Sequence, residues 1–136
     1  MKYHIKRSVL GFGFLLLGMV MPVTPSPHHS FAAEFDANKP ITTSGFVTKI
    51  DWSNPHVWFY INVKKDDGSI ENWGFEMGPP HLLQTTGWTR TTVKIGDEVV
   101  VNGFMAKNGT RRANARTVTM AATGEKLGAG SSQLNP

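Results

Sequence analysis

A stretch of regular alternation in the middle of the chain most constrains its fold. Between His56 and Val63, aliphatic and phenylalanine side chains occupy the odd positions, and the even positions carry His, Trp, Tyr and Asn. This period of two predicts a half-buried β-strand. Asp67-Gly68 follows, a pair typical of a two-residue hairpin because such a turn needs positive φ. Ile70–Met77 then returns with large apolar residues on one side, which completes a predicted antiparallel hairpin.

The remaining patterned segments complete an all-β fold. Ile41–Trp52 reads as a first strand in which alternation slips once, so we expect a bulge near Lys49. His81–Thr86 follows two prolines and predicts a short helix, and Glu98–Phe104 and Ala113–Met120 predict two more strands. The predicted order is three strands, a short helix between strands 3 and 4, and two further strands. This is the order of a five-stranded OB-type barrel. An open β-sandwich is the alternative, and the helix position favours the barrel.

The start of the chain has the layout of a secretion signal. Basic residues stand before an apolar run at Val9–Val23, and small residues follow. The run is shorter than the roughly 20 apolar residues of a membrane span. We expect residues 1–26 to be the signal peptide, with a cut after Ser26, although Ser30 and Ala32 allow a cut as late as residue 32. We therefore expect a periplasmic or secreted protein with no membrane attachment after signal removal.

About 105 residues then remain, which is the size of one domain. We expect an N-terminal arm at 27–40, the OB-like domain at 41–122 and a flexible tail at 123–136, where Ser, Gly and Ala dominate. The leader holds three of the fourteen basic residues, which leaves eleven against ten acidic ones and a net charge of about +1. This small excess argues against a nucleic-acid partner. Cysteine is absent, which excludes disulfides and thiolate metal sites, and we expect a monomer.

Several separate blocks of sequence occur in a fixed order along the chain. They are His28–Asp36, Asn54–Phe59, Trp73–Gly78, Gly87–Arg90, Ile95–Val99 and Asn114–Arg116. Together these blocks resemble a family of small exported bacterial proteins that is catalogued only as a domain of unknown function. The resemblance covers about His28 to Leu127, and it implies a periplasmic location and an OB-like barrel. It implies no activity.

Histidines are the candidate metal ligands of this chain. His28 and His29 form a pair with Glu34 and Asp36 close behind them, and His56 lies on a loop that an N-terminal arm can reach. Neutral imidazole is a common ligand for copper and zinc, so His28, His29 and His56 are a candidate site for either ion. The alternative is a solvated polar arm, with His56 hydrogen-bonded to loop backbone. A late signal cut would remove the His pair.

An outward aromatic face is the candidate ligand surface. Trp58 and Tyr60 are expected on the same outward face of the predicted strand as His56. Exposed aromatic rings of this kind stack on bases or sugars. The alternative is that Phe31 and Phe35 fold back and cover Trp58. Arg111 and Arg112 belong to a small basic group, with Lys107 and Arg116, that is able to meet an anion. The alternative is solvated hairpin charge.

These features favour an exported binding module for an unknown small molecule, metal ion or periplasmic protein, and not an enzyme. Glu76 stands alone, with no second carboxylate at a readable spacing for acid–base catalysis. No nucleophile, phosphate-binding or dinucleotide motif is present, and no cofactor is expected. The alternative function is a periplasmic copper or zinc protein that uses the N-terminal His pair.

Overall fold

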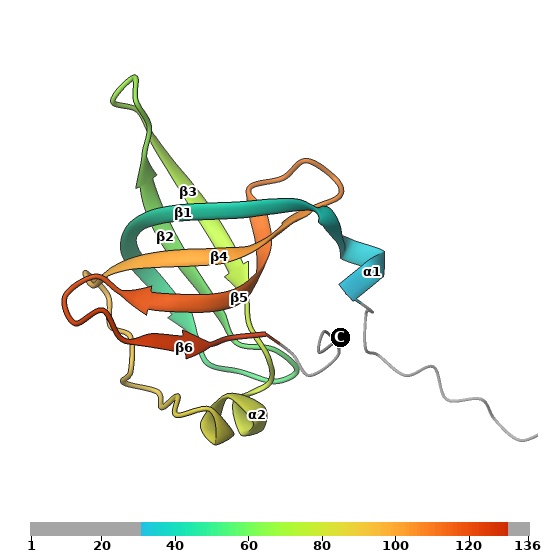
Figure 1. Ribbon diagram of the computed structural model, residues 1–136, viewed down its shortest axis with the longest axis vertical. Helices are drawn as coiled ribbons and strands as arrows, with labels where there is room; N and C mark the ends of the chain where they lie inside the picture. Colours follow the sequence, from blue (N-terminus) through green and yellow to red (C-terminus); the bar gives the residue numbers. More distant parts are fainter. Residues whose placement is uncertain (1–30, 131–136) are drawn as a thin grey trace, which may run out of the picture.

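The computed structural model describes residues 31–130, whose strands form one sheet closed into a ring (Figure 1). A one-turn helix, α1, precedes the sheet, and a second short helix, α2, lies between its third and fourth strands. The elements are α1 (Phe31–Glu34), β1 (Phe35–Asp51), β2 (Trp58–Lys64), β3 (Ile70–Glu76), α2 (Pro80–Thr85), β4 (Glu98–Ala106), β5 (Arg112–Met120) and β6 (Lys126–Gly128).

The strand order explains how the ring closes. The sheet runs β3-β2-β1-β4-β5-β6, and its neighbours pair in antiparallel fashion. An additional parallel pairing joins β3 to β5, with Phe75 opposite Ala113 and Glu76 opposite Asn114. The prediction of a mostly β fold is confirmed, and its sheet is closed.

The long first strand serves two neighbours. Its first half pairs with β4 and its second half with β2, so that β1 arches across the molecule in Figure 1. The register with β2 shifts between Val47 and Lys49, which confirms the bulge expected near Lys49. A bulge bends its strand and increases the local twist, and this bend lets one strand contribute to both sides of the ring.

The inside of the ring holds the core. Phe59 of β2 and Phe75 of β3 stack there with ring centroids 5.4 Å apart and planes 20° apart. Both side chains are inward members of the alternating pattern, which confirms its inner face. The largest fully buried apolar side chains are Phe59, Phe75, Ile61, Met77, Leu83, Val47, Val57, Val99, Val101 and Val118.

Two predicted boundaries and the strand count are wrong. The sheet has six strands, because Lys126–Gly128 pairs with β5 inside the segment expected to be a flexible tail. That strand has three residues, too few for a period of two to be recognised. At the other end β1 begins at Phe35, within the segment expected to be an arm, and Phe35 pairs with Ala106 of β4.

The segment between β3 and β4 covers one end of the core. α2 buries Leu83, and Trp88 just after it is 3% exposed. The Trp88 Nε1–H donates to the Gly128 carbonyl of β6 at 2.7 Å, which fastens this segment to the last strand. In Figure 1 α2 lies at the bottom of the view, below β6. Neither helix among residues 31–130 is long and apolar enough to cross a membrane.

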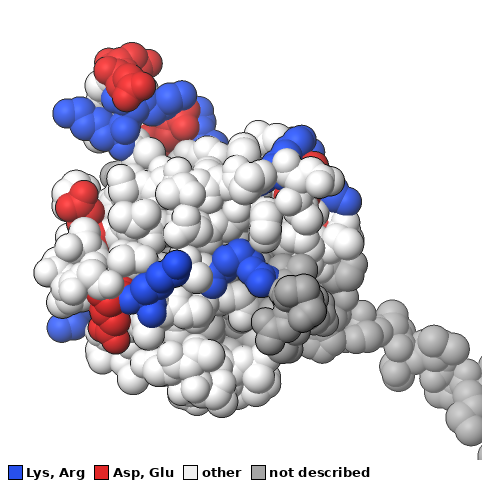
Figure 2. All heavy atoms as spheres, in the orientation of Figure 1, with Lys and Arg blue, Asp and Glu red and all other residues white. Residues whose placement is uncertain are grey.

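Charged side chains lie in several groups on the face shown in Figure 2, at a projecting hairpin and over the body of the molecule. Basic and acidic residues crowd the tip of the β2–β3 hairpin at the top of the view, where Lys64, Lys65, Asp66 and Asp67 are exposed. Much of the remaining face is uncharged in that view. The hairpin tip carries both signs and is typical of solvated turn charge.

We expect Phe59→Ala to destabilise the fold by about 3–5 kcal/mol, because the change leaves a cavity beside Phe75. Phe46→Ala is the matched control, since Phe46 is 55% exposed on β1, and it should change stability by less than about 0.5 kcal/mol. Urea unfolding followed by tryptophan fluorescence measures both. Similar losses in the two variants would contradict the assignment of the inner face.

Candidate functional site

The candidate site begins with a row of aromatic rings on the outer face of β2. Trp58 and Tyr60 are both half-buried, and their rings stack with centroids 6.5 Å apart and planes 25° apart. Gly74 of β3 lies opposite Tyr60. A Cβ at Gly74 would come within 3.0 Å of the Tyr60 ring, so glycine at this position lets the ring lie across the neighbouring strand.

Cations lie over both rings of this row. The Arg112 guanidinium carbon is 4.4 Å from the Trp58 ring centroid, and the Lys49 Nζ is 5.3 Å from that of Tyr60. Both distances fall within the range of cation–π contacts. Of the two rings named as the alternative cover for Trp58, Phe31 packs on Phe35 and Phe104, with centroids 5.7 Å and 5.8 Å away. Phe35 lines the same hollows as Trp58. The predicted stacking platform is therefore a cation–aromatic stack.

A histidine–carboxylate pair lies next to Trp58. His56 comes from the β1–β2 loop and Glu76 from the last position of β3, and His56 Nδ1 is 2.9 Å from Glu76 Oε1. Glu76 is also the register partner of Trp58. It points away from the core by alternation, yet it is only 7% exposed. The fold thus buries an ionisable side chain on the outer face of the sheet.

This burial changes the acidity of Glu76. Loss of hydration, and to a smaller extent the nearby Glu34 carboxylate, raises the pKa of Glu76 to about 7, while Arg112 acts in the opposite direction. Burial raises a carboxyl pKa because it disfavours the charged form. Glu76 thus exchanges its proton near neutral pH.

A buried amide continues the same row of residues across the sheet. Asn114 of β5 is the register partner of Glu76 and is 1% exposed. Its Oδ1 accepts no hydrogen bond from any of the described residues. Gly103 lies against the same stretch of β5, where a Cβ would come within 2.1 Å of the Asn114 carbonyl oxygen. Glu76 and Asn114 are the two buried polar side chains among residues 31–130.

A pocket of about 290 Å³ opens over these residues. We call it the arm pocket, because Glu34 and Phe35 at the start of β1 form one of its walls. A second hollow of about 230 Å³ adjoins it at Glu34, Phe35, Trp58 and Arg112. The arm pocket is lined by Glu34, Phe35, Ser53, Asn54, Pro55, His56, Trp58, Glu76 and Arg112.

Lys107 fastens the residues of α1 beside the arm pocket. Its Nζ donates to the Ala32 carbonyl, and its backbone N–H donates to the Glu34 carbonyl at 2.9 Å. In Figure 1, α1 lies beside the start of β1 and the β4–β5 turn. Packing of Phe31 on Phe104 of β4 adds an apolar contact at the same place. The wall formed by Glu34 and Phe35 is thus attached to the sheet.

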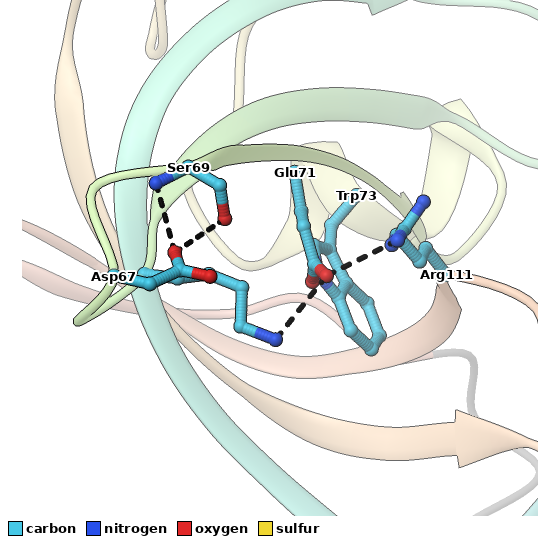
Figure 3. Close-up of polar contacts among 6 residues, drawn as sticks. Asp67, Ser69, Glu71, Trp73 and Arg111 are labelled. Carbon is cyan, nitrogen blue, oxygen red and sulfur yellow. Dashed lines mark hydrogen bonds and ion pairs between the residues drawn. The ribbon is translucent and has the colours of Figure 1, made fainter.

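The two arginines predicted to bind a ligand do different things. Arg112 lines the arm pocket, whereas Arg111 donates to Glu71 Oε1 at 3.1 Å in a separate cluster on β3 (Figure 3). Lys65 Nζ reaches the same oxygen at 3.3 Å. A hydrogen bond from the Trp73 Nε1–H, followed by those of Arg111 and Lys65, lowers the pKa of Glu71. Arg111 therefore lies in an ion pair with Glu71 and outside the lining of the arm pocket.

Of the other predicted site residues, the structure brings three together and leaves the rest apart. His56, Trp58 and Arg112 meet in the arm pocket, while Tyr60 lies outside its lining. No group of three His, Asp or Glu residues within 31–130 is placed to hold a metal ion. His28 and His29 fall outside the described residues. Glu76 and Asn114 were not predicted, because alternation alone makes both of them exposed.

Comparisons with known proteins give a family and one solved structure. The model of a family of unknown function, DUF6152, matches residues 18–115. No curated protein matches the chain. A crystal structure of the mitochondrial single-stranded DNA-binding protein from S. cerevisiae is similar at 10% identity and a TM-score of 0.49, covering 61% of this chain and 93% of that chain.

The expectation of no nucleic-acid partner is corrected by this comparison. The similar structure is that of a single-stranded DNA-binding protein. A net charge of about +1 was the ground for the exclusion, but net charge does not describe how cations such as Arg112 and Lys49 gather over aromatic rings. A nucleic-acid partner is therefore no longer excluded. The similarity, at a TM-score of 0.49, does not identify what this chain itself binds.

We expect Glu76→Gln to stabilise the protein relative to the wild type as the pH rises. The folded pKa of about 7 lies above the ordinary value of 4.5, so the folded state holds its proton more tightly than the unfolded chain. The contribution of Glu76 is greatest below pH 4.5 and is lost as the pH rises through 7.

Glutamine has no proton to lose, so the difference in unfolding free energy should move in favour of the variant by on the order of 1–2 kcal/mol between about pH 5 and pH 8. Urea midpoints across this range measure it. Parallel curves for the two proteins would show that Glu76 keeps an ordinary pKa.

Proposed function

The chain belongs to this family of unknown function, and we propose that it is an exported OB-type binding module whose ligand occupies the arm pocket. The ligand is a small molecule or an ion, and we propose no catalytic role. The module consists of a closed sheet with an attached N-terminal wall. The pocket size supports this proposal, since about 290 Å³ lies near the lower end of small-molecule sites.

One observation carries the proposal: the buried carboxyl group of Glu76 lines this pocket. The buried amide of Asn114 lies beside it on the neighbouring strand. A carboxyl group without full hydration costs free energy, and so does an amide oxygen without a donor. Neither side chain belongs to the apolar core. A carboxyl group of this kind, perturbed in acidity and placed in a cleft, is typical of functional sites. A ligand that donates a hydrogen bond would satisfy Glu76.

The walls of the arm pocket support binding of a partly polar ligand. Trp58 and Phe35 offer apolar area, and His56, Glu76 and Arg112 add polar groups of either charge. A concave, partly aromatic site with a few convergent polar groups is the usual form of a small-ligand site. Arg112 is held over Trp58, so the cation is positioned before a ligand arrives.

Export is part of the proposal, and the contacts of α1 bear on where the signal is cut. Phe31 packs on Phe104, and the Ala32 carbonyl accepts a hydrogen bond from Lys107. A cut after Ala32 would remove both contacts, whereas a cut after Ser26 keeps them. These contacts support the earlier cut and a mature chain that retains His28 and His29. A periplasmic or secreted location is proposed from the signal-peptide layout of the first residues.

We expect the protein recovered from the periplasm to begin at Pro27. Intact-mass measurement on the exported chain reads this directly, and the cytoplasmic precursor is the control. A mature chain that begins at Ala33 would contradict the early cut. Recovery of the uncut chain from the cytoplasm alone would contradict export.

We expect at least one member of a panel of small amines, carboxylic acids and sugars to bind the exported protein saturably. Ligand-observed NMR measures binding, and Trp58→Ala should weaken it by about tenfold or more because the ring forms a wall of the pocket. Phe46→Ala is the control, since this exposed ring lies on β1 outside the pocket lining.

Circular dichroism of both variants establishes that they fold. Equal binding by folded Trp58→Ala protein would place the ligand elsewhere. A panel without any binder, together with an absence of binding by metal ions, would contradict the proposed function.

A further inference from the structure

Arg112 is a positioned cation that has no carboxylate partner within the described part of the chain. Its guanidinium carbon lies 4.4 Å from the centroid of the Trp58 ring, and the ion pairs among residues 31–130 do not include it. The N–H donors of a guanidinium point outward in its plane, so a contact with a ring face does not use all of them. Because Arg112 is also exposed, these donors are accessible to an anion.

The second hollow, of about 230 Å³, is where such an anion fits. Lys107 and Arg112 line it together with one acidic residue, Glu34, so two cations face one carboxylate and one positive charge is in excess. Lys107 Nζ donates to the Ala32 carbonyl, and an ammonium keeps further N–H donors after one such bond. A ligand that carries a single negative charge would balance the excess.

The arm pocket suits the uncharged part of the same ligand. Phe35 and Trp58 line both hollows, and their rings offer apolar area beside Arg112. Glu76 lines the arm pocket but not the second hollow, so a second anionic group on the ligand would meet a carboxyl group there. A hydroxyl or amide group in the same place would instead donate a hydrogen bond to Glu76.

We propose that the ligand of the arm pocket is a small organic monocarboxylate with a ring-containing, uncharged body. Its carboxylate lies in the second hollow at Arg112 and Lys107, and its body extends along Trp58 into the arm pocket. This inference rests on the proposed function, since it names the ligand class of the same pocket.

The chemistry of the two cations agrees with a carboxylate. A guanidinium and a carboxylate form two parallel N–H···O bonds, which gives geometric specificity as well as affinity. A phosphate monoester carries about 1.5–2 negative charges at neutral pH, which exceeds the single charge that the second hollow balances. An amine would place a second cation beside Arg112 and Lys107. The charge of the lining therefore favours a monocarboxylate over both.

Titration of the exported protein with benzoate, phenylacetate and 4-hydroxyphenylacetate, each beside its own amide, tests the inference. We expect at least one acid to bind saturably and to move the indole N–H resonance of Trp58 in ¹⁵N NMR spectra, which Trp58→Ala identifies by its loss. The Trp88 indole is the internal control, because its N–H is bonded to the Gly128 carbonyl. The matching amide keeps the body without the charge and should bind roughly tenfold more weakly or worse.

Arg112→Gln should weaken binding of the acid by roughly tenfold or more, because a charge-assisted pair is lost. Arg111→Gln is the matched control, since it removes the same charge from the adjacent residue, which donates to Glu71 outside both hollows. At physiological ionic strength, where screening acts over about 8 Å, this control should change the affinity by less than about twofold.

Circular dichroism establishes that the arginine variants fold. If Arg112→Gln does not fold, Arg112→Lys takes its place with Arg111→Lys as its control, because lysine keeps the charge and lacks the planar fork. Arg112→Lys should then bind the acid more weakly than Arg111→Lys does.

Equal binding of an acid and its amide, or equal losses in the folded Arg112 and Arg111 variants, would overturn the inference. Absence of binding by all three acids would also overturn it. An amine or a sugar that binds and is lost in Trp58→Ala would then keep the proposed function while the carboxylate is rejected.

Discussion

The parallel pairing of β3 with β5 is the contact on which the rest of the structure depends. It closes the sheet, since β3 and β5 are otherwise separated by β2, β1 and β4 in the strand order. The same pairing sets Glu76 directly beside Asn114. The Gly74 N–H donates to the Arg111 carbonyl at 3.0 Å, which places Arg112 where its guanidinium reaches Trp58. Closure and the site are thus consequences of one register.

The N-terminal arm converts this part of the outer sheet face into a pocket. Without a wall, Glu76 would face water, as alternation along β3 implies. Glu34 and Phe35 supply the wall, and Lys107 from the end of β4 holds the backbone of the arm by two hydrogen bonds. The chain therefore builds its site from segments at both ends of the ring, and the arm is as much a part of the site as the strands.

Most of the fold could be predicted because periodicity and turn chemistry are local. Each local feature can be recognised from a few neighbouring residues. Examples are the alternation at Val57–Val63, the Asp67-Gly68 turn and the slip in alternation near Lys49. β6 could not be predicted, since Lys126–Gly128 is too short to show a period and is held by Thr117–Thr119 far along the chain. Phe35 was assigned to an arm because pairing with Ala106 is equally distant in sequence.

The site was predicted only in part, for a similar reason. The sequence singles out His56, Trp58 and Arg112 by their side-chain types, and all three line the arm pocket. Arg111 was grouped with Arg112, but consecutive residues on extended backbone point to opposite sides, and Arg111 turns to Glu71 instead. The burial of Glu76 depends on the arm folding over it, a long-range contact that alternation does not encode.

The position of bound density in crystals of the protein recovered from the periplasm tests the central claim most directly. The account predicts an ion or molecule in the arm pocket, within contact distance of His56, Trp58 or Glu76. A well-ordered arm that leads into an empty pocket, with the ligand seated on another face of the ring, would contradict it.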